Sequence, residues 1–70
     1  MIKAGSTVYH TPSNEEWFVL GVNQNIGRIC VAGSEPTVLE IADCTLVEAG
    51  RGLTAWERKS REALFGPEWV

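Results

Sequence analysis

Few residues of this 70-residue chain carry side chains that could do covalent or acid–base chemistry. His10 is the only histidine, so a nucleophilic triad would have to combine it with Ser13 or Ser34 and with Asp43. Nothing in the spacing of these residues predicts that they meet in the fold. We interpret His10 as an edge-strand histidine with one ring nitrogen in water, and we predict no catalytic residues and no enzyme activity.

The cysteines, Cys30 and Cys44, lack the paired C-x-x-C spacing of a zinc site. A site made from both thiols and His10 would offer three ligands without a local pair, so we predict no metal and no cofactor. We expect two buried thiols that pack as small hydrophobic side chains. A disulfide stays open as an alternative if the strands that carry the two cysteines are neighbours.

The acidic residues form no catalytic pair. Glu15 and Glu16 are adjacent at the start of an expected strand, where successive side chains point to opposite faces, so they are badly placed to share a proton. Residues 1–50 hold two basic residues against six acidic ones, and residues 51–70 hold four against three. This balance disfavours nucleic acid, which needs a basic surface, and a net charge of −4 on the first part is small for a phosphate mimic.

The first part of the chain has the pattern of a small sheet. Between residues 7 and 48, β-branched and aromatic residues alternate and turn signals recur every eight to ten positions. We expect five strands, at 7–10, 16–22, 28–32, 37–41 and 45–48, with one helical turn at 42–44. Alternation along the second strand predicts one face with Trp17, Val19 and Gly21 and another with Phe18, Leu20 and Val22.

Both faces of this second strand are apolar, so we expect it to be buried on both sides. One side would face a barrel interior and the other a helix or a second subunit. Gly21 is the natural place for a bend or bulge.

A single capped helix is predicted over residues 54–66. Thr54 and Glu57 fit a capping box, and Gly66 followed by Pro67 is a stop signal. We expect this helix to pack on the barrel through a stripe that contains Trp56, Ser60, Ala63 and Leu64, in line with Leu53. The opposite face would then expose Arg58, Arg61 and Phe65.

The strand and turn pattern also resembles a known class of proteins. It is carried by Val8, His10, Pro12, Ser13, Glu15, Trp17 and Val19 and later by Ile41, Asp43, Cys44 and Leu46. It resembles the SH3-like small barrels, in particular the short uncharacterised ones encoded by phages, prophages and other mobile elements. The resemblance covers about residues 5–48 and no catalytic motif, so it implies a fold more than a function.

The expected fold is therefore mainly β, a five-stranded antiparallel SH3-like small barrel over residues 1–50 with one C-terminal α-helix within 51–70, in a single domain. Signalling domains of this fold bind proline-rich ligands in an aromatic groove, but this chain lacks their acidic loop beside a tyrosine-rich strand. Type II dihydrofolate reductase, also a small barrel, uses a Gln-Ile-Tyr stretch, where this chain has Leu39, Glu40 and Ile41.

We therefore expect a non-enzymatic protein-protein interaction module, an accessory protein of a phage or mobile element that binds a host protein or a copy of itself. Inhibition of host defence is one form that this role could take. The expected partner-binding residues are Tyr9, Trp17, Arg58, Arg61 and Phe65. A nucleic-acid-associated small barrel and a small oligomeric enzyme stay open as alternatives.

We expect a cytoplasmic protein. Residues 1–7 have no apolar run typical of a signal peptide. The longest apolar stretch, residues 17–22, is far below the roughly 20 residues that cross a bilayer.

Overall fold

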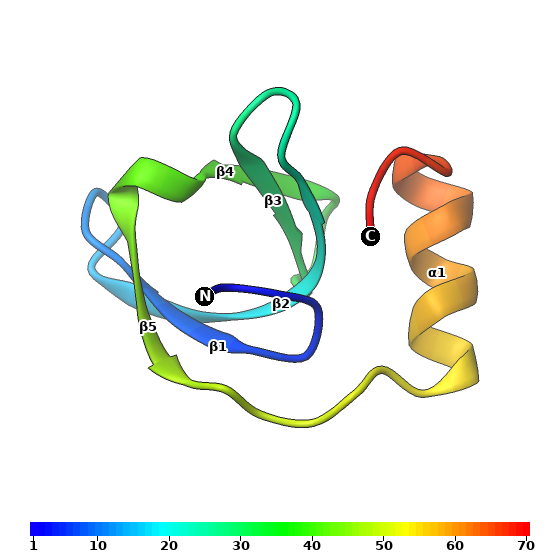
Figure 1. Ribbon diagram of the computed structural model, residues 1–70, viewed down its shortest axis with the longest axis horizontal. Coiled ribbons are helices and arrows are strands. Elements are labelled where there is room, and N and C mark those ends of the chain that lie inside the picture. The colour runs from blue at the N-terminus through cyan, green and yellow to red at the C-terminus, as the bar shows by residue number, and fades with distance from the viewer.

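The computed structural model describes residues 1–70 as a five-stranded antiparallel sheet with one C-terminal helix (Figure 1). This confirms the predicted mainly β class, the number of strands and the terminal helix. The helical turn before the last strand begins one residue earlier than predicted. The elements are β1 (Thr7–His10), β2 (Glu15–Asn23), β3 (Arg28–Val31), β4 (Thr37–Glu40), the 3₁₀ turn η1 (Ile41–Asp43), β5 (Cys44–Glu48) and α1 (Ala55–Phe65).

The sheet curls strongly but does not close. Its strand order is β4-β3-β2-β1-β5, so β4 and β5 are its two edges and are joined only through η1 (Figure 1). Two backbone hydrogen bonds hold this corner, from Ile41 N to Gly27 O at 3.0 Å and from Thr11 N to Asp43 O at 3.1 Å. The structure thus shows an open, curled sheet where a closed barrel was expected.

The inside of the curl is filled by six buried side chains, Val8, Val19, Val22, Ile29, Val31 and Leu39. Val19 and Val22 share this face because the pairing of β2 with β3 shifts between Val19 and Gly21. Leu20 is the extra residue of a β-bulge there. The predicted irregularity near Gly21 is confirmed, whereas the predicted grouping of Val22 with Phe18 and Leu20 is wrong, because the bulge turns Val22 inward.

The outer face of β2 and β3 is covered by the C-terminal segment. Leu20, Cys30 and Trp69 are buried together there, and Phe18, Leu53 and Phe65 pack against them. The rings of Phe65 and Trp69 are 5.9 Å apart at 59°, a tilted aromatic pair. Val70 N donates to Val22 O at 2.9 Å and ties the segment to β2. β2 is therefore buried on both faces, as its composition predicts.

Helix α1 has the predicted caps but is rotated about its axis relative to the prediction. Glu57 N donates to Thr54 Oγ1 at 3.1 Å, and Thr54 N donates to Glu57 Oε1 at 2.9 Å. Trp56 and Leu64, expected to face the sheet, are 76% and 56% exposed. Arg61 instead lies over the sheet and donates from Nη1 to Leu20 O at 3.2 Å. A long arginine stem can cover apolar surface while its head finds a polar partner, and this is why the helical wheel gave the wrong face.

Residues 5–6 of the N-terminal segment lie between β2 and the linker that joins β5 to α1. They are hydrogen-bonded to β2: Gly5 N donates to Val19 O at 2.8 Å, and Ser6, which is fully buried, accepts at its carbonyl from Val19 N at 2.9 Å. At the crossing with the linker, backbone lies directly against backbone. Gly5 and Gly50 both have positive φ, +93° and +72°. A Cβ on Gly5 would lie 1.5 Å from Arg51 O, and a Cβ on Gly50 would lie 1.9 Å from Gly5 O. Only glycine fits at this crossing.

No helix of the structure combines the length and the apolar character that spanning a bilayer requires.

We predict that Gly50→Ala lowers the free energy of unfolding by about 2 kcal/mol or more, because a strained left-handed residue and a backbone clash add. Gly52→Ala is the matched control, since a Cβ there meets nothing within 4 Å, and its effect should stay within about 0.5 kcal/mol. Urea unfolding of both variants measures the difference. Equal stabilities would contradict the crossing.

We also predict that Gly21→Ala loosens the C-terminal segment. Its Cβ would lie 2.6 Å from Arg61 Cδ, 3.2 Å from Trp69 Cβ and 3.3 Å from Cys30 Sγ. Overpacking of about 1–3 kcal/mol should open the cover over Cys30 and speed its alkylation by iodoacetamide about tenfold or more. Intact mass spectrometry in a Cys44→Ser background measures this rate, and an unchanged rate would rule the close contact out.

Candidate functional site

Tyr9 and Trp17, two of the predicted partner-binding residues, lie on opposite faces of the sheet. Trp17 is paired with Val8 across β1 and β2 and packs against the inner core. Tyr9 is paired with Glu16 and points to the other face, where its hydroxyl donates to Asn14 Oδ1. These two aromatic residues therefore do not share a surface.

The structure does bring His10 and Ser13 together, which their spacing did not predict. Ser13 N donates to His10 Nδ1 at 3.3 Å, and the Ser13 hydroxyl oxygen lies 2.8 Å from the same ring nitrogen. Ser13 Oγ also accepts from Trp17 Nε1 at 3.1 Å. Asp43 meets this segment only through its backbone carbonyl, which accepts from Thr11 N. The network closes the turn between β1 and β2 and orients Trp17, and it lacks the carboxylate of a triad.

Cys30 and Cys44 are both free and belong to different layers. Cys30 lies in the outer cluster with Trp69, and burial raises its pKa to about 11. Cys44 packs against the inner core, and its pKa is raised by burial and then by the Asp43 carboxylate. The alternative of a disulfide is therefore not realised. No group of three or more His, Cys, Asp or Glu side chains is arranged to hold a metal ion.

Arg58, Arg61 and Phe65 do not form the exposed face that was predicted. Arg61 and Phe65 lie in the contact between α1 and β2, where Phe65 packs on the outer cluster. Arg58 is exposed, and its Nη1 donates to Leu53 O at 3.0 Å. The predicted exposure is wrong for Arg61 and Phe65, which are half-buried because both take part in holding the helix on the sheet.

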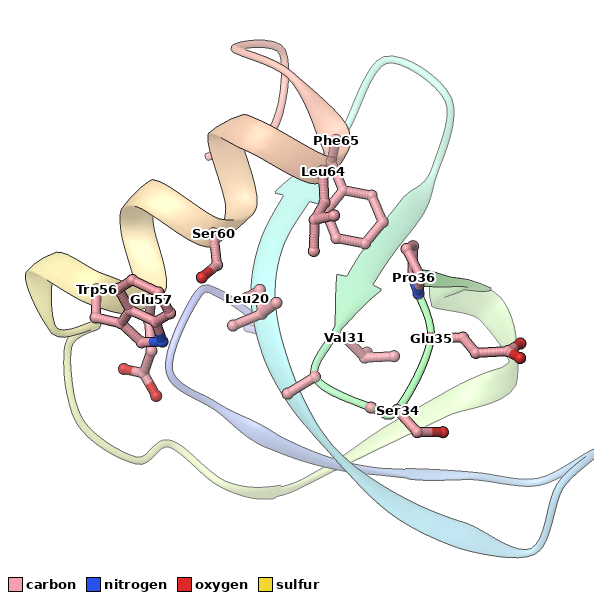
Figure 2. Close-up of a pocket in the computed structure, with 12 residues that line it drawn as sticks. Leu20, Val31, Ser34, Glu35, Pro36, Trp56, Glu57, Ser60, Leu64 and Phe65 are labelled. Atoms are coloured by element: carbon pink, nitrogen blue, oxygen red, sulfur yellow. The ribbon is translucent and has the colours of Figure 1, made fainter.

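The larger hollow on the surface lies between α1 and the loop that joins β3 to β4 (Figure 2). We call it the helix–loop groove; its volume is about 480 Å³. Leu64 and Phe65 project from the end of α1 toward the loop segment that carries Pro36 (Figure 2). The apolar lining consists of Leu20, Val31, Ala32, Pro36, Trp56, Leu64 and Phe65.

Each wall of the groove is held by contacts of its own. The helix wall presents Trp56, Ser60 and Leu64, spaced four residues apart on one stripe of α1. On the loop wall, Thr37 Oγ1 donates to Glu35 O at 3.0 Å. Gly33 lies so close to the Trp17 ring that a Cβ there would be 3.3 Å from Cζ3. Trp17 therefore supports the loop wall from beneath, although it does not line the groove.

The charged side chains that line the groove are both carboxylates, Glu35 and Glu57. Glu35 has no ion-pair partner, and its carboxylate points away from the hollow at the rim (Figure 2). Arg51 binds Glu57 at two points, Nη1 to Oε1 and Nη2 to Oε2, both at 2.8 Å. The Arg51 hydrogen bond, followed by that of Thr54 N, lowers the pKa of Glu57 to about 2. Arg51 also lies 4.8 Å above the Phe18 ring.

The helix–loop groove was not predicted from the sequence. Trp56 and Leu64 were recognised as one apolar stripe, but they were assigned to the sheet. One feature of the sequence could have indicated the groove. The helix and the residues after it carry two pairs of apolar side chains, Trp56 with Leu64 and Phe65 with Trp69, and one open sheet can cover only one pair.

Comparisons of the chain with protein-family models, with curated proteins and with solved structures found no match. The fold and the groove define the class to which the chain belongs, a small β protein with a terminal helix and an open apolar hollow between them. Its function has to be inferred from that geometry.

We predict that acid removes the contribution of the Arg51–Glu57 pair to stability. The pKa of Glu57 falls from 4.5 in the unfolded chain to about 2 in the folded one, so the contribution is complete above pH 4.5 and is lost as the pH falls toward 2. Glu57→Gln keeps a capping side chain but not the ion pair. The stability difference between wild type and variant, from urea unfolding, should shrink over this interval. A constant difference would contradict the pair.

Proposed function

We propose that this chain is a small, non-enzymatic protein-binding module whose docking site is the helix–loop groove. The observation that carries the proposal is the exposure of Trp56 and Leu64, 76% and 56%, beside an apolar hollow. Tryptophan is enriched at the energetic centres of protein interfaces, and an exposed apolar patch beside a pocket is typical of a binding surface.

The SH3-like assignment belongs to the same proposal. The strong curl of the sheet and the single helical turn between its last two strands support it. The resemblance to short accessory proteins of phages and mobile elements makes a host protein or a second copy of the chain the proposed partner.

The lining of the groove indicates the chemistry of the segment that binds there. Both charged lining residues are acidic, and Glu35 has no cationic partner within the chain. The exposed face of Trp56 also suits a Lys or Arg side chain through a cation–π contact. We therefore propose that the groove takes a large apolar side chain flanked by Lys or Arg.

The nucleic-acid alternative has less support. The unpaired charge at the groove is the Glu35 carboxylate on its rim, since Glu57 is paired with Arg51, and this charge disfavours phosphate. Arg51 and Arg61, two of the four bases of residues 51–70, are held by Glu57 and by Leu20 O. The enzyme alternative also lacks support in the groove, which is lined by no histidine, cysteine or lysine.

We predict that a blocked hexapeptide of leucine and lysine binds in the groove, and that its counterpart with glutamate in place of lysine does not. The indole N–H signal of Trp56 in ¹⁵N-resolved NMR spectra should shift in a saturable way. Measured for the variants from the backbone amide signals of the groove residues, because Trp56→Ala has no indole signal at that position, Trp56→Ala should weaken binding about tenfold or more, and Glu35→Gln should weaken it about two- to fivefold.

Val47→Ala is the control, since Val47 is an exposed apolar residue on β5, outside the groove. It should leave the peptide affinity unchanged. Equal binding of the acidic peptide, or shifts centred on β5, would contradict the assignment of the groove.

A further inference from the structure

The exposed stripe of α1 has a large–small–large pattern centred on Ser60. Trp56 lies four residues before Ser60 and Leu64 four residues after it, and the nearby Ala63 is also small. Residues four apart share a face of a helix. The stripe therefore presents two large apolar side chains at equal distances from a point where another helix can approach closely.

A two-fold interface requires that one patch contain both a projection and a hollow that receives it. Trp56 is the projection, and Leu64 with Pro36 borders the hollow. If a second helix runs antiparallel across Ser60, Trp56 of each copy lies opposite Leu64 of the other. Both hollows are then filled by one arrangement.

We infer that the occupant of the helix–loop groove is a second copy of this chain, with two α1 helices antiparallel and crossing at Ser60. This inference rests on the proposed function and names its partner. It makes the chain a symmetric dimer in which each copy is both the binding module and the bound segment.

Charge supports this occupant. The groove requires an apolar side chain with a cation, and Lys59, three residues after Trp56, lies beside it on the helix surface. Residues 51–70 carry four bases against three acids, whereas residues 1–50, which include the loop wall with Glu35, carry two bases against six acids. The helix of one copy is thus complementary in sign to the sheet part of the other.

Another surface that a second copy could use is the free edge of β5, and it is less suitable. Antiparallel pairing of two β5 strands around Leu46 would bring Glu48 of one copy near Asp43 of the other. Like charges across such a pair are unfavourable, and charged edges protect sheets from pairing.

Sedimentation velocity from micromolar to millimolar concentration tests the dimer with the full chain. We expect a monomer–dimer equilibrium in which Trp56→Ala raises the dissociation constant about tenfold or more. Val47→Ala removes an apolar side chain of comparable exposure from β5 and should leave the constant unchanged.

Directed cross-linking tests the geometry. In a Cys44→Ser background, Ser60→Cys places thiols of the two copies at the symmetry axis, within the range of a disulfide. Mild oxidation should give a covalent dimer, seen by mass spectrometry without reductant. Arg58→Cys, on the far side of the helix from the stripe, should give none.

Two results would overturn the inference. One is a monomer at millimolar concentration without a cross-link at position 60. The other is a dimer that is indifferent to Trp56→Ala and cross-links equally from position 58. If the leucine–lysine peptide still shifts the Trp56 signal in the first case, the protein-binding proposal survives and only the choice of partner fails.

Discussion

The close approach of the C-terminal segment to Gly21 is the contact on which the rest of the structure depends. An added Cβ at this position would lie 2.6 Å from Arg61 Cδ and 3.2 Å from Trp69 Cβ. Because β2 presents bare backbone there, the stem of Arg61 can lie flat on the sheet while its guanidinium reaches Leu20 O. This contact sets the rotation of α1, and with it the outward direction of Trp56 and Leu64.

The bulge lets β2 contribute side chains both to the inner core and to the outer cluster. Leu20 is the extra residue in the pairing, so Val19 and Val22 both enter the inner core while Leu20 joins Cys30 and Trp69 outside. An 11-residue helix is marginal by propensity alone. The outer cluster and the capping network of Thr54, Glu57 and Arg51 therefore stabilise α1 together, one along its side and the other at its first turn.

Local chemistry predicted the strands, the bulge and the caps of the helix, because turn residues, alternation and a capping box act within a few positions of the chain. The predicted face of the helix was wrong and closure of the sheet into a barrel was not confirmed, since both depend on contacts between distant segments. A helical wheel ranks the faces of a helix by apolar character and so placed Trp56 against the sheet. It contains no information on Gly21, 40 positions earlier, which leaves room on the sheet for the side-chain stem of Arg61. Of the predicted site, only Arg58 stayed exposed on the helix, and the groove was not foreseen.

Two pairs of apolar side chains could cover the outer face of this sheet, Trp56 with Leu64 or Phe65 with Trp69. The second pair covers it, so the first pair stays exposed beside the groove. Phe65 belongs to the group that covers the sheet, because Trp69 follows it and the two rings pack together on Leu20 and Cys30. Trp56 and Leu64 are then left on a helix whose own stability no longer requires them. Side chains released in this way are free to contact a partner without loosening the domain. A 70-residue protein with little core to spare can thus combine a stable fold with an apolar binding surface.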